Sequence, residues 1–333
     1  MEKRLFHFAL ASCLGLASTV LVLWLGMTNT AWAVDVRYVA PPGAGGSDSG
    51  NNCLASSSPC ATVQHAIDEA SAGDEIHIAG GTYAPGSTVA KIDKELTLVG
   101  AYSPSNFGGP DPDMYETVLD AGRNGSVVTV TNTAGVVLLH LTLTGGDGTG
   151  NCGTVGCGGG IYLKNAELHV LHSVITGNVG SDSGRGWGGG IYADNSGGGP
   201  TVTIFGSRIE NNMGSTNSST EGSGGGVYAF YGEITLAENQ IVSNSACNST
   251  SSMCFGAGVY LGEVSHADVL TNTIRSNEAN RGGTATSWGG GLYISGGSGI
   301  LLADNLIEGN RANWGGGGGI DINWSLATLQ FNK

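Results

Sequence analysis

Residues 188–212, GGGIYADNSGGGPTVTIFGSRIENN, form one unit of a long repeat that decides the fold. The unit opens with three glycines followed by Ile191 and Tyr192, and it closes with Ile209 and Asn212. The opening motif recurs at Gly158–Tyr162, Gly224–Tyr228, Gly256–Tyr260, Gly289–Tyr293 and Gly317–Asp321. The closing motif recurs at residues 175–178, 241–244, 274–277 and 307–310, so its successive asparagines are 34, 32, 33 and 33 residues apart. Self-similarity at such a period is typical of a solenoid, in which each repeat is one coil.

A short segment of alternating apolar residues lies between the two motifs. Its apolar pairs are Leu168/Val170, Val202/Ile204, Ile234/Leu236, Ala267/Val269, Ile300/Leu302 and Ala327/Leu329. Alternation with a period of two marks a strand with one buried face. One coil cannot bury its aliphatic face alone, and stacked coils can. The pattern therefore predicts an all-β, right-handed parallel β-helix, with variable loops between each closing asparagine and the next glycine cluster.

The repeat also predicts which side chains face outward. The aliphatic residues that flank the tyrosine of each opening motif are expected to point into the core, so the tyrosine between them points outward. These tyrosines form a predicted stacked ladder: Tyr162, Tyr192, Tyr228, Tyr260 and Tyr293. Trp187, Phe255, Trp288 and Trp314 lie at or near the residue before a glycine cluster. Such an aromatic strip either stacks only between coils or also stacks on sugar rings.

A second predicted column lies at a turn and is polar. Its members are Ser173, Ser207, Asn239, Asn272, Asn305 and Asn332. Small hydroxyl and amide side chains stacked at a turn can bond to one another and to turn backbone that the core would otherwise leave unpaired. The glycine clusters are predicted to be tight bends where coils approach closely.

Upstream of the repeats, residues 62–71 (TVQHAIDEAS) form the one good helix candidate. Val63, Ala66, Ile67 and Ala70 share one face, and Gly73 is a predicted stop signal. We expect this short N-terminal helix to cap the first coil and protect its strand edge. Early strands are predicted at residues 75–79, 96–99, 127–131 and 136–143, with a Pro/Gly/Asp-rich excursion at residues 101–117.

The first 33 residues are predicted to be a secretory signal peptide. Lys3 and Arg4 precede an apolar run, and Ala31-Trp32-Ala33 resembles a signal-peptidase site. An uncleaved membrane anchor and a lipoprotein attached at Cys13 are the alternatives. No other stretch of the sequence is apolar enough to span a membrane. The predicted domains are the signal peptide (1–33) and one β-helix domain (34–333), with a cap region (34–84), early coils (85–157) and regular repeats (158–333).

The six cysteines beyond the signal peptide fall into close pairs, Cys53/Cys60, Cys152/Cys157 and Cys247/Cys254. Proximity predicts three local disulfides, which an exported protein can form. Metal binding is the competing interpretation, but the sequence has no C-x-x-C motif. The net charge is −14, and loss of one acidic and two basic residues with the signal peptide makes it −15. This charge argues against binding to nucleic acid or to anionic membranes.

Several stretches resemble known proteins. Residues 60–83 (CATVQHAIDEASAGDEIHIAGGTY), 96–103 (LTLVGAYS) and 118–122 (VLDAG) resemble segments of secreted bacterial right-handed β-helix proteins. The repeats resemble those of polymorphic outer membrane proteins, GGA[ILV] and F-x-x-N, with Ile in place of Phe and Gly mostly in place of Ala. The resemblance implies the pectate lyase-like superfamily over nearly all of the mature chain. It implies no single function, because that superfamily includes polysaccharide lyases, glycoside hydrolases, epimerases and non-catalytic adhesins.

The sequence offers weak candidates for catalysis or metal binding. Asp111 and Asp113 flank a proline, which is typical of a turn. Arg275, Glu210 and Glu308 occupy equivalent places and are expected to form a solvated charge ladder. His169 and His172 are predicted to lie on opposite faces of a strand, which argues against a shared metal. His140 aligns with His172 one coil earlier, either as a stacked pair or, as we expect, as a plain surface column.

These observations favour a non-catalytic protein, secreted or displayed at the cell surface, that serves adhesion or interaction. The predicted glycan-contacting residues are the tyrosine ladder with Trp187, Trp288 and Trp314, and the predicted partners are a surface polysaccharide or a protein receptor. We predict no metal and no cofactor. The alternative is a carbohydrate-active enzyme, a polysaccharide lyase or glycoside hydrolase, in which case Ca²⁺ would be expected. The last coil has no capping helix in the sequence, so a partner or a further segment is expected to cover it.

Overall fold

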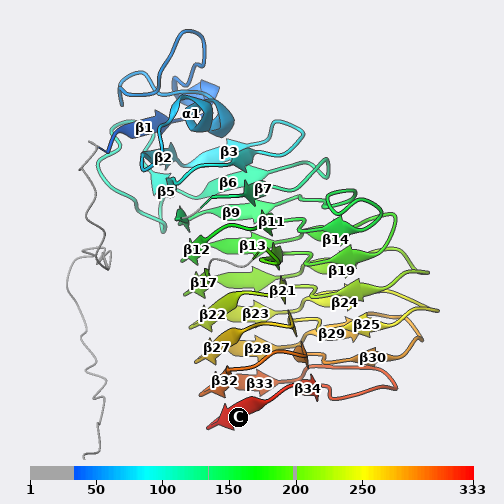
Figure 1. The fold of residues 1–333 in the computed structure, drawn as a ribbon. Coiled ribbons are helices and arrows are strands. Elements are labelled where there is room, and N and C mark those ends of the chain that lie inside the picture. Colours follow the sequence, from blue (N-terminus) through cyan, green and yellow to red (C-terminus); the bar gives the residue numbers. More distant parts are fainter. Residues whose placement is uncertain (1–33, 134, 198–200) are drawn as a thin grey trace, which may run out of the picture. The chain divides into compact units, whose positions relative to one another are not determined.

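The computed structural model describes residues 34–133, 135–197 and 201–333 (Figure 1). Contacts place Val34–Lys333 in one compact unit. The predicted signal peptide lies outside the described residues. In the part of the chain that the structure describes, no helix has the length and apolar character needed to cross a membrane.

The unit is a parallel β-solenoid in which each coil adds one strand to every sheet it passes through. Three sheets form the body. Sheet I contains β1 (Val36–Val39), β2 (Glu75–Ala79), β5 (Thr97–Tyr102), β8 (Val136–Leu139), β12 (Leu168–Leu171), β17 (Thr201–Phe205), β22 (Glu233–Ala237), β27 (His266–Leu270), β32 (Ile300–Ala303) and β35 (Ala327–Gln330).

The other two body sheets have eight strands each. Sheet II contains β3 (Gly81–Tyr83), β6 (Thr117–Asp120), β9 (Thr142–Thr144), β13 (Val174–Thr176), β18 (Arg208–Glu210), β23 (Gln240–Val242), β28 (Thr273–Arg275) and β33 (Leu306–Glu308). Sheet III contains β4 (Ala90–Ile92), β7 (Val128–Thr131), β11 (Ile161–Lys164), β16 (Ile191–Asp194), β21 (Val227–Phe230), β26 (Val259–Gly262), β31 (Leu292–Ser295) and β34 (Ile320–Asn323).

Two smaller sheets form an arm that each regular coil sends out from the body (Figure 1). The outgoing sheet contains β14 (Val179–Ser181), β19 (Met213–Ser215), β24 (Ser245–Cys247) and β29 (Glu278–Asn280). The returning sheet contains β10 (Gly156–Cys157), β15 (Gly186–Trp187), β20 (Gly222–Ser223), β25 (Cys254–Phe255) and β30 (Ser287–Trp288). The arm occupies the segment predicted to be a variable loop, so that segment contains strands.

The predicted core columns are confirmed. Ile175 pairs with Ile209 and Ile209 pairs with Ile241 in neighbouring strands of sheet II, and all three side chains are fully buried. The apolar pairs of sheet I and the aliphatic residues on each side of the tyrosines in sheet III are stacked in the same way. Together they form one continuous aliphatic core. The stack is therefore held in register by burial of one side of every body strand.

The glycine clusters are tight bends, as predicted. Gly188 and Gly224 have φ angles of 61° and 59°, in the left-handed region that glycine adopts without a Cβ penalty. A similar left-handed residue bends the chain between sheets I and II, at His140 and His172 for example, with φ angles of 55° and 45°. The predicted strand over residues 136–143 is therefore two strands, β8 and β9, separated by the bend at His140.

Two rows of buried polar side chains run along the stack. The predicted Ser/Asn column is confirmed, with Asn239 Nδ2 donating to Asn272 Oδ1 at 3.1 Å. The asparagines of the closing motif form a second row, in which Asn212 Nδ2 donates to Asn244 Oδ1 at 3.1 Å and to Ile175 O at 2.8 Å. The sequence interpretation did not predict this second row. Both rows satisfy turn backbone inside the stack.

The cap region contains helix α1 (Val63–Glu69) and a 3-10 turn, η1 (Pro42–Ala44). Thr62 caps α1 by accepting a hydrogen bond from the His65 backbone N–H, and Val63, Ala66 and Ile67 are buried against the first coils. The predicted capping helix is thus confirmed. Its predicted end is wrong, because the helix stops at Glu69 and is followed by extended Ala70, whereas Gly73 belongs to the next turn.

Strand β1 was not predicted. It precedes β2 in sheet I, and the guanidinium of its Arg37 is buried, 3.2 Å from the Asp74 carboxylate. The excursion at residues 101–117 is an irregular loop, as predicted. The Asp111 carbonyl in it accepts hydrogen bonds from the backbone of Met114 and Tyr115, which confirms a turn there.

Candidate binding face

The candidate site is the outer face of sheet III beneath the arm. The predicted tyrosine ladder is confirmed, because in-register strands place the five tyrosines on successive coils. Ring centroids of consecutive tyrosines are 5.7, 5.4, 4.5 and 5.4 Å apart from Tyr162 to Tyr293. Most of these rings are nearly parallel, so each ring occupies the face of its neighbour.

Arm aromatics pack against the ladder from the other side. Trp187 stacks 5.5 Å from Tyr228. Phe255 stacks 5.1 Å from Trp288 within the arm, and its ring also lies 5.1 Å from that of Tyr293 in the ladder. Consequently Tyr192, Tyr228 and Tyr293 are only 5–7% exposed, whereas Tyr162 and Tyr260 are half-buried. With the Cys152–Cys157 disulfide, part of the ladder forms a second small apolar cluster. The tyrosines therefore present edges and hydroxyls to solvent rather than ring faces.

The hydroxyl ends of the ladder meet polar groups that sequence reasoning missed. Asp194 lies near the Tyr192 hydroxyl and Ser295 near the Tyr260 hydroxyl, and each affects the pKa of its tyrosine. Asn323 Nδ2 donates a hydrogen bond to the Tyr293 hydroxyl at 3.3 Å. Burial, with the neighbouring Tyr293, raises the pKa of Tyr260 to about 12. Burial also raises the pKa of Tyr192, with smaller contributions from Asp194 and Tyr162. The signal for Asp194 was present, because it lies two residues after Tyr192 in one strand and therefore faces the same way.

Trp314 lies apart from the ladder. Its side chain is 87% exposed, and Asp321 takes the place of a tyrosine in the strand beside Tyr293. Exposed apolar side chains cluster in the same final coil, including Trp324 at 90% and Phe331 at 80%. Of the eight predicted aromatic residues, the structure thus brings seven together and separates Trp314. Sugar binding by any of them stays a prediction.

All three predicted disulfides are present. Cys53–Cys60 closes a loop in the cap region, and Cys152–Cys157 and Cys247–Cys254 close loops of the arm. Their Cα–Cα distances are 5.1, 5.9 and 5.8 Å, within the usual range for disulfides. The Cys152–Cys157 bridge packs in the aromatic cluster, and the Cys247–Cys254 bridge packs among alanines of the arm.

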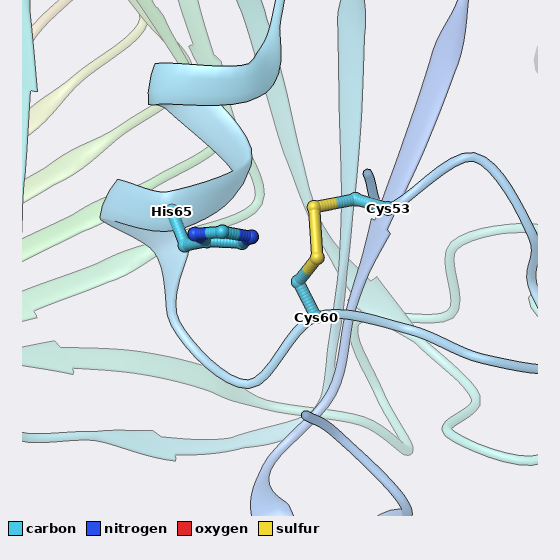
Figure 2. A group of neighbouring side chains, drawn as sticks. All are labelled: Cys53, Cys60 and His65. Atoms are coloured by element: carbon cyan, nitrogen blue, oxygen red, sulfur yellow. A yellow bond between two sulfur atoms is a disulfide. The ribbon is translucent and has the colours of Figure 1, made fainter. Parts of the chain in front are cut away.

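One group of potential metal ligands lies in the cap region. Figure 2 shows the His65 ring beside the Cys53–Cys60 disulfide. The two sulfur atoms are bonded to each other, so neither is a thiolate ligand. His65 Nε2 is 2.7 Å from the Asn51 carbonyl oxygen. These residues do not fit a metal ion in the oxidised protein.

The remaining charged candidates do not converge. Arg275 lies beside Glu308 in sheet II, but Val242 separates it from Glu210. Glu210 instead pairs with Arg208 of its own strand at 2.6 Å.

His169 lies 3.3 Å from Glu167 on the outside of sheet I. His140 and His172 do meet: their rings stack with centroids 5.7 Å apart, so the expected plain surface column is wrong.

Comparisons with known proteins add little to this picture. No family model matches the chain, and no curated protein matches it. Among solved structures, the chain is similar to a crystal structure of pectate lyase Pel9A, with 14% sequence identity and a TM-score of 0.39. That match covers 88% of this chain and 78% of the other. At this level the similarity concerns the parallel β-solenoid alone.

Proposed function

We propose that this protein is an exported, non-catalytic β-helix that serves adhesion or interaction and binds a glycan along the outer face of sheet III. A row of tyrosine hydroxyls on five successive coils, with the Asp194 carboxylate beside it, supports the proposal most directly. A repetitive polymer can meet such a face with the same contact at successive units. The contact would be a hydrogen bond to a sugar hydroxyl, because the ring faces are already occupied.

Export is supported by the disulfides. Three local bridges are expected in an oxidising compartment outside the cytoplasm and are rare inside it. The net charge of −14 favours a neutral or cationic glycan over a polyuronate, which the protein would repel. A surface polysaccharide or a glycosylated receptor is therefore the partner we propose.

The test is a glycan array followed by calorimetry with the best neutral polysaccharide. Tyr260→Phe removes one hydroxyl and keeps the ring in the ladder, and Asp194→Asn removes one carboxylate. Each variant should weaken binding about 5- to 10-fold, the value of one hydrogen bond to a neutral or charged group. Glu233→Gln, an exposed carboxylate on sheet I, is the matched control and should bind as the unaltered protein does.

Two outcomes would overturn the proposal. One is glycan binding that both sheet III variants leave unchanged. The other is depolymerisation of a polysaccharide by the protein, which would make it a carbohydrate-active enzyme. The absorbance of unsaturated products, measured with and without Ca²⁺, detects this activity.

A further inference from the structure

An apolar stripe runs along the outer face of sheet I. In-register strands place one outward side chain of each coil in a single column, which we call the sheet I stripe: Leu171, Phe205, Ala237, Leu270 and Ala303. Each of these side chains is half-buried, and none belongs to the apolar clusters of the described residues. The strands that carry them, β12 to β32, are stacked along one side of the solenoid (Figure 1). By contrast, the outward positions of sheet II in these coils include Arg208, Gln240 and Arg275, so apolar side chains are concentrated on sheet I.

The chain itself covers the start of this column. Towards the cap region the column continues from Leu171 through Leu139 to Val99. There the ring of Phe107, from the excursion, packs in a small cluster with Val99 and Tyr102 and is only 7% exposed, and Leu139 packs against the same cluster. The outer face of sheet I therefore accepts an aromatic side chain from a segment that crosses it, and the stripe continues this surface onto the following coils.

The stripe varies in height from coil to coil. Ala237 pairs with Phe205 on one side and with Leu270 on the other, and Leu270 pairs with Ala303. The two alanines are much shorter than their neighbours, so each makes a notch in the column. Phe205 is held beside the first notch by an edge-to-face contact with the His172 ring at 5.5 Å. Two notches between bulky side chains are places where apolar side chains of another molecule can insert.

A carboxylate lies beside each notch. Glu238 and Asp304 directly follow Ala237 and Ala303, both are exposed, and both lie at the left-handed bend that leads to sheet II. Each notch thus combines an apolar contact with a negative charge. A segment with a basic side chain beside an apolar one complements this pattern.

The other charges around the stripe do not alter this preference. From β2 to β35 the described strands of sheet I contain no lysine or arginine. On the outer face, His266 is 3.2 Å from the Asp268 carboxylate, and on the adjoining sheet Arg208 is paired with Glu210. A second copy of this chain would bring equivalent carboxylates together, so the charge favours a basic partner over self-association.

The spacing of the notches matches a helix that lies along the solenoid axis. The two alanines are two coils apart, which is about 9.6 Å at the usual spacing of neighbouring strands. Residues i and i+7 on one face of an α-helix are about 10.5 Å apart. In an extended strand, residues that face one side are about 6.8 Å apart, or about 13.6 Å at every second one, which fits less well.

We propose that the sheet I stripe is the docking surface for a basic amphipathic helix of a partner protein, with its apolar residues i and i+7 in the notches at Ala237 and Ala303. Lysine or arginine side chains of the helix meet Glu238 and Asp304. This surface is separate from the proposed glycan face on sheet III, so the protein can hold a polysaccharide and a second protein at the same time.

Fluorescence anisotropy with a labelled synthetic peptide tests the proposal on the oxidised full chain. The peptide is a lysine-rich helix with leucines at i, i+3, i+4 and i+7, and the control peptide has the same composition with the leucines scattered around the helix. The unaltered protein should bind the first peptide at least about tenfold more tightly than the second, because only the first buries all its leucines on one face.

Two substitutions test the apolar contact. Phe205→Ser should weaken binding of the amphipathic peptide about tenfold, since it removes the largest apolar side chain of the stripe. Val242→Ser, at a half-buried outward position of sheet II, is the matched control and should change affinity less than twofold. Ala237→Leu adds apolar surface but fills a notch. It should therefore also weaken binding, whereas an unspecific apolar contact would become stronger.

The double variant Glu238→Gln/Asp304→Asn tests the charges. It should weaken binding about fivefold at low salt and make the affinity less dependent on salt. Asp111→Asn/Asp113→Asn removes two exposed carboxylates of the excursion, so it is the matched control for net charge and should bind as the unaltered protein does. Because the double variant and Ala237→Leu change only surface positions, they test the proposal even if Phe205→Ser folds poorly.

Several outcomes would overturn the proposal. These are no binding of the amphipathic peptide, equal binding of the two peptides, normal binding by Phe205→Ser, or tighter binding by Ala237→Leu. A dimer seen in analytical ultracentrifugation that Phe205→Ser dissociates would also overturn it, because the stripe would then be covered by a second copy of this chain.

Discussion

The body and the arm stack the same coils by different means. In the body, every coil contributes isoleucine, leucine or valine side chains to one core, and most of these side chains are completely buried. In the arm, the strands are only two or three residues long, and the small apolar cluster between them consists of alanines and cysteines. The comparison indicates that side-chain volume sets the spacing of sheets in the body, whereas backbone contact sets it in the arm.

This difference predicts that the two regions fail under different substitutions. Deleting methyl groups should damage the body, because a cavity remains in a packed core. Adding a methyl group should damage the arm, because its glycines lie against backbone atoms of the next coil. Changes to the aromatic contact between the two regions should be milder.

The largest expected effect is that of Ile209→Ala in sheet II. The Ile209 side chain is fully buried between Ile175 and Ile241, so its removal should lower the free energy of unfolding by about 3–4 kcal/mol. Chemical denaturation measures this change. Val242→Ala, on the outer face of the next strand, is the control and should cost under about 1 kcal/mol. Equal losses of unfolding free energy for the two variants would contradict the conclusion that only one face of sheet II packs into the core.

A smaller effect is expected for Gly186→Ala in the returning strand β15. A Cβ atom there would lie against the backbone carbonyl of Gly214 in the next coil, so the arm must shift at a cost of about 2–3 kcal/mol. Gly184→Ala is the control, since its nearest neighbour would be at 3.5 Å, and it should be nearly neutral. Hydrogen exchange should locate the loss in the arm; a uniform loss of protection would show that arm and body unfold together.

The smallest effect at pH 7 is expected for Tyr260→Phe in the ladder, about 0.5–1 kcal/mol for the lost hydroxyl contact. It should, however, change the alkaline limit of stability. The folded pKa of Tyr260 is about 12 against an ordinary 10.0, so its stabilising contribution is complete below pH 10 and is lost as the pH rises toward 12. Between pH 9 and pH 12 the free energy of unfolding should fall less steeply with pH in the variant than in the unaltered protein. Equal slopes for the two proteins would contradict a role of Tyr260 ionisation in alkaline unfolding.

The body was predictable because its repeat carries its own register. Each body strand has an aliphatic residue at every second position, and this pattern recurs every 32–34 residues. The pattern therefore determines the register in which successive coils stack. The arm was not predictable from the same rule. Strands such as Gly186–Trp187 and Gly222–Ser223 have too few side chains to show alternation, so the sequence indicated a loop, and the covering of Tyr228 was not foreseen.

The candidate sites show the same limit. The ladder followed from its place between two core columns, and the disulfides followed from proximity. The His140–His172 pair depends on a bend that places both rings outside the alternation of their strands, so strand periodicity assigned no contact between them. Strand β1 was missed because Arg37 occupies an inward position, which is explained by the buried carboxylate of Asp74.

The asparagine row of the closing motif has a direction. Each Nδ2 donates to the Oδ1 of the following coil, from Asn178 through Asn212, Asn244 and Asn277 to Asn310. The amide dipoles of the row are therefore aligned along the solenoid axis, and each bond polarises the next. The solenoid therefore has an electric dipole along its axis. The amide hydrogen bonds in the middle of the row should be stronger than those at either end, so the cohesion of the stack grows with the number of coils.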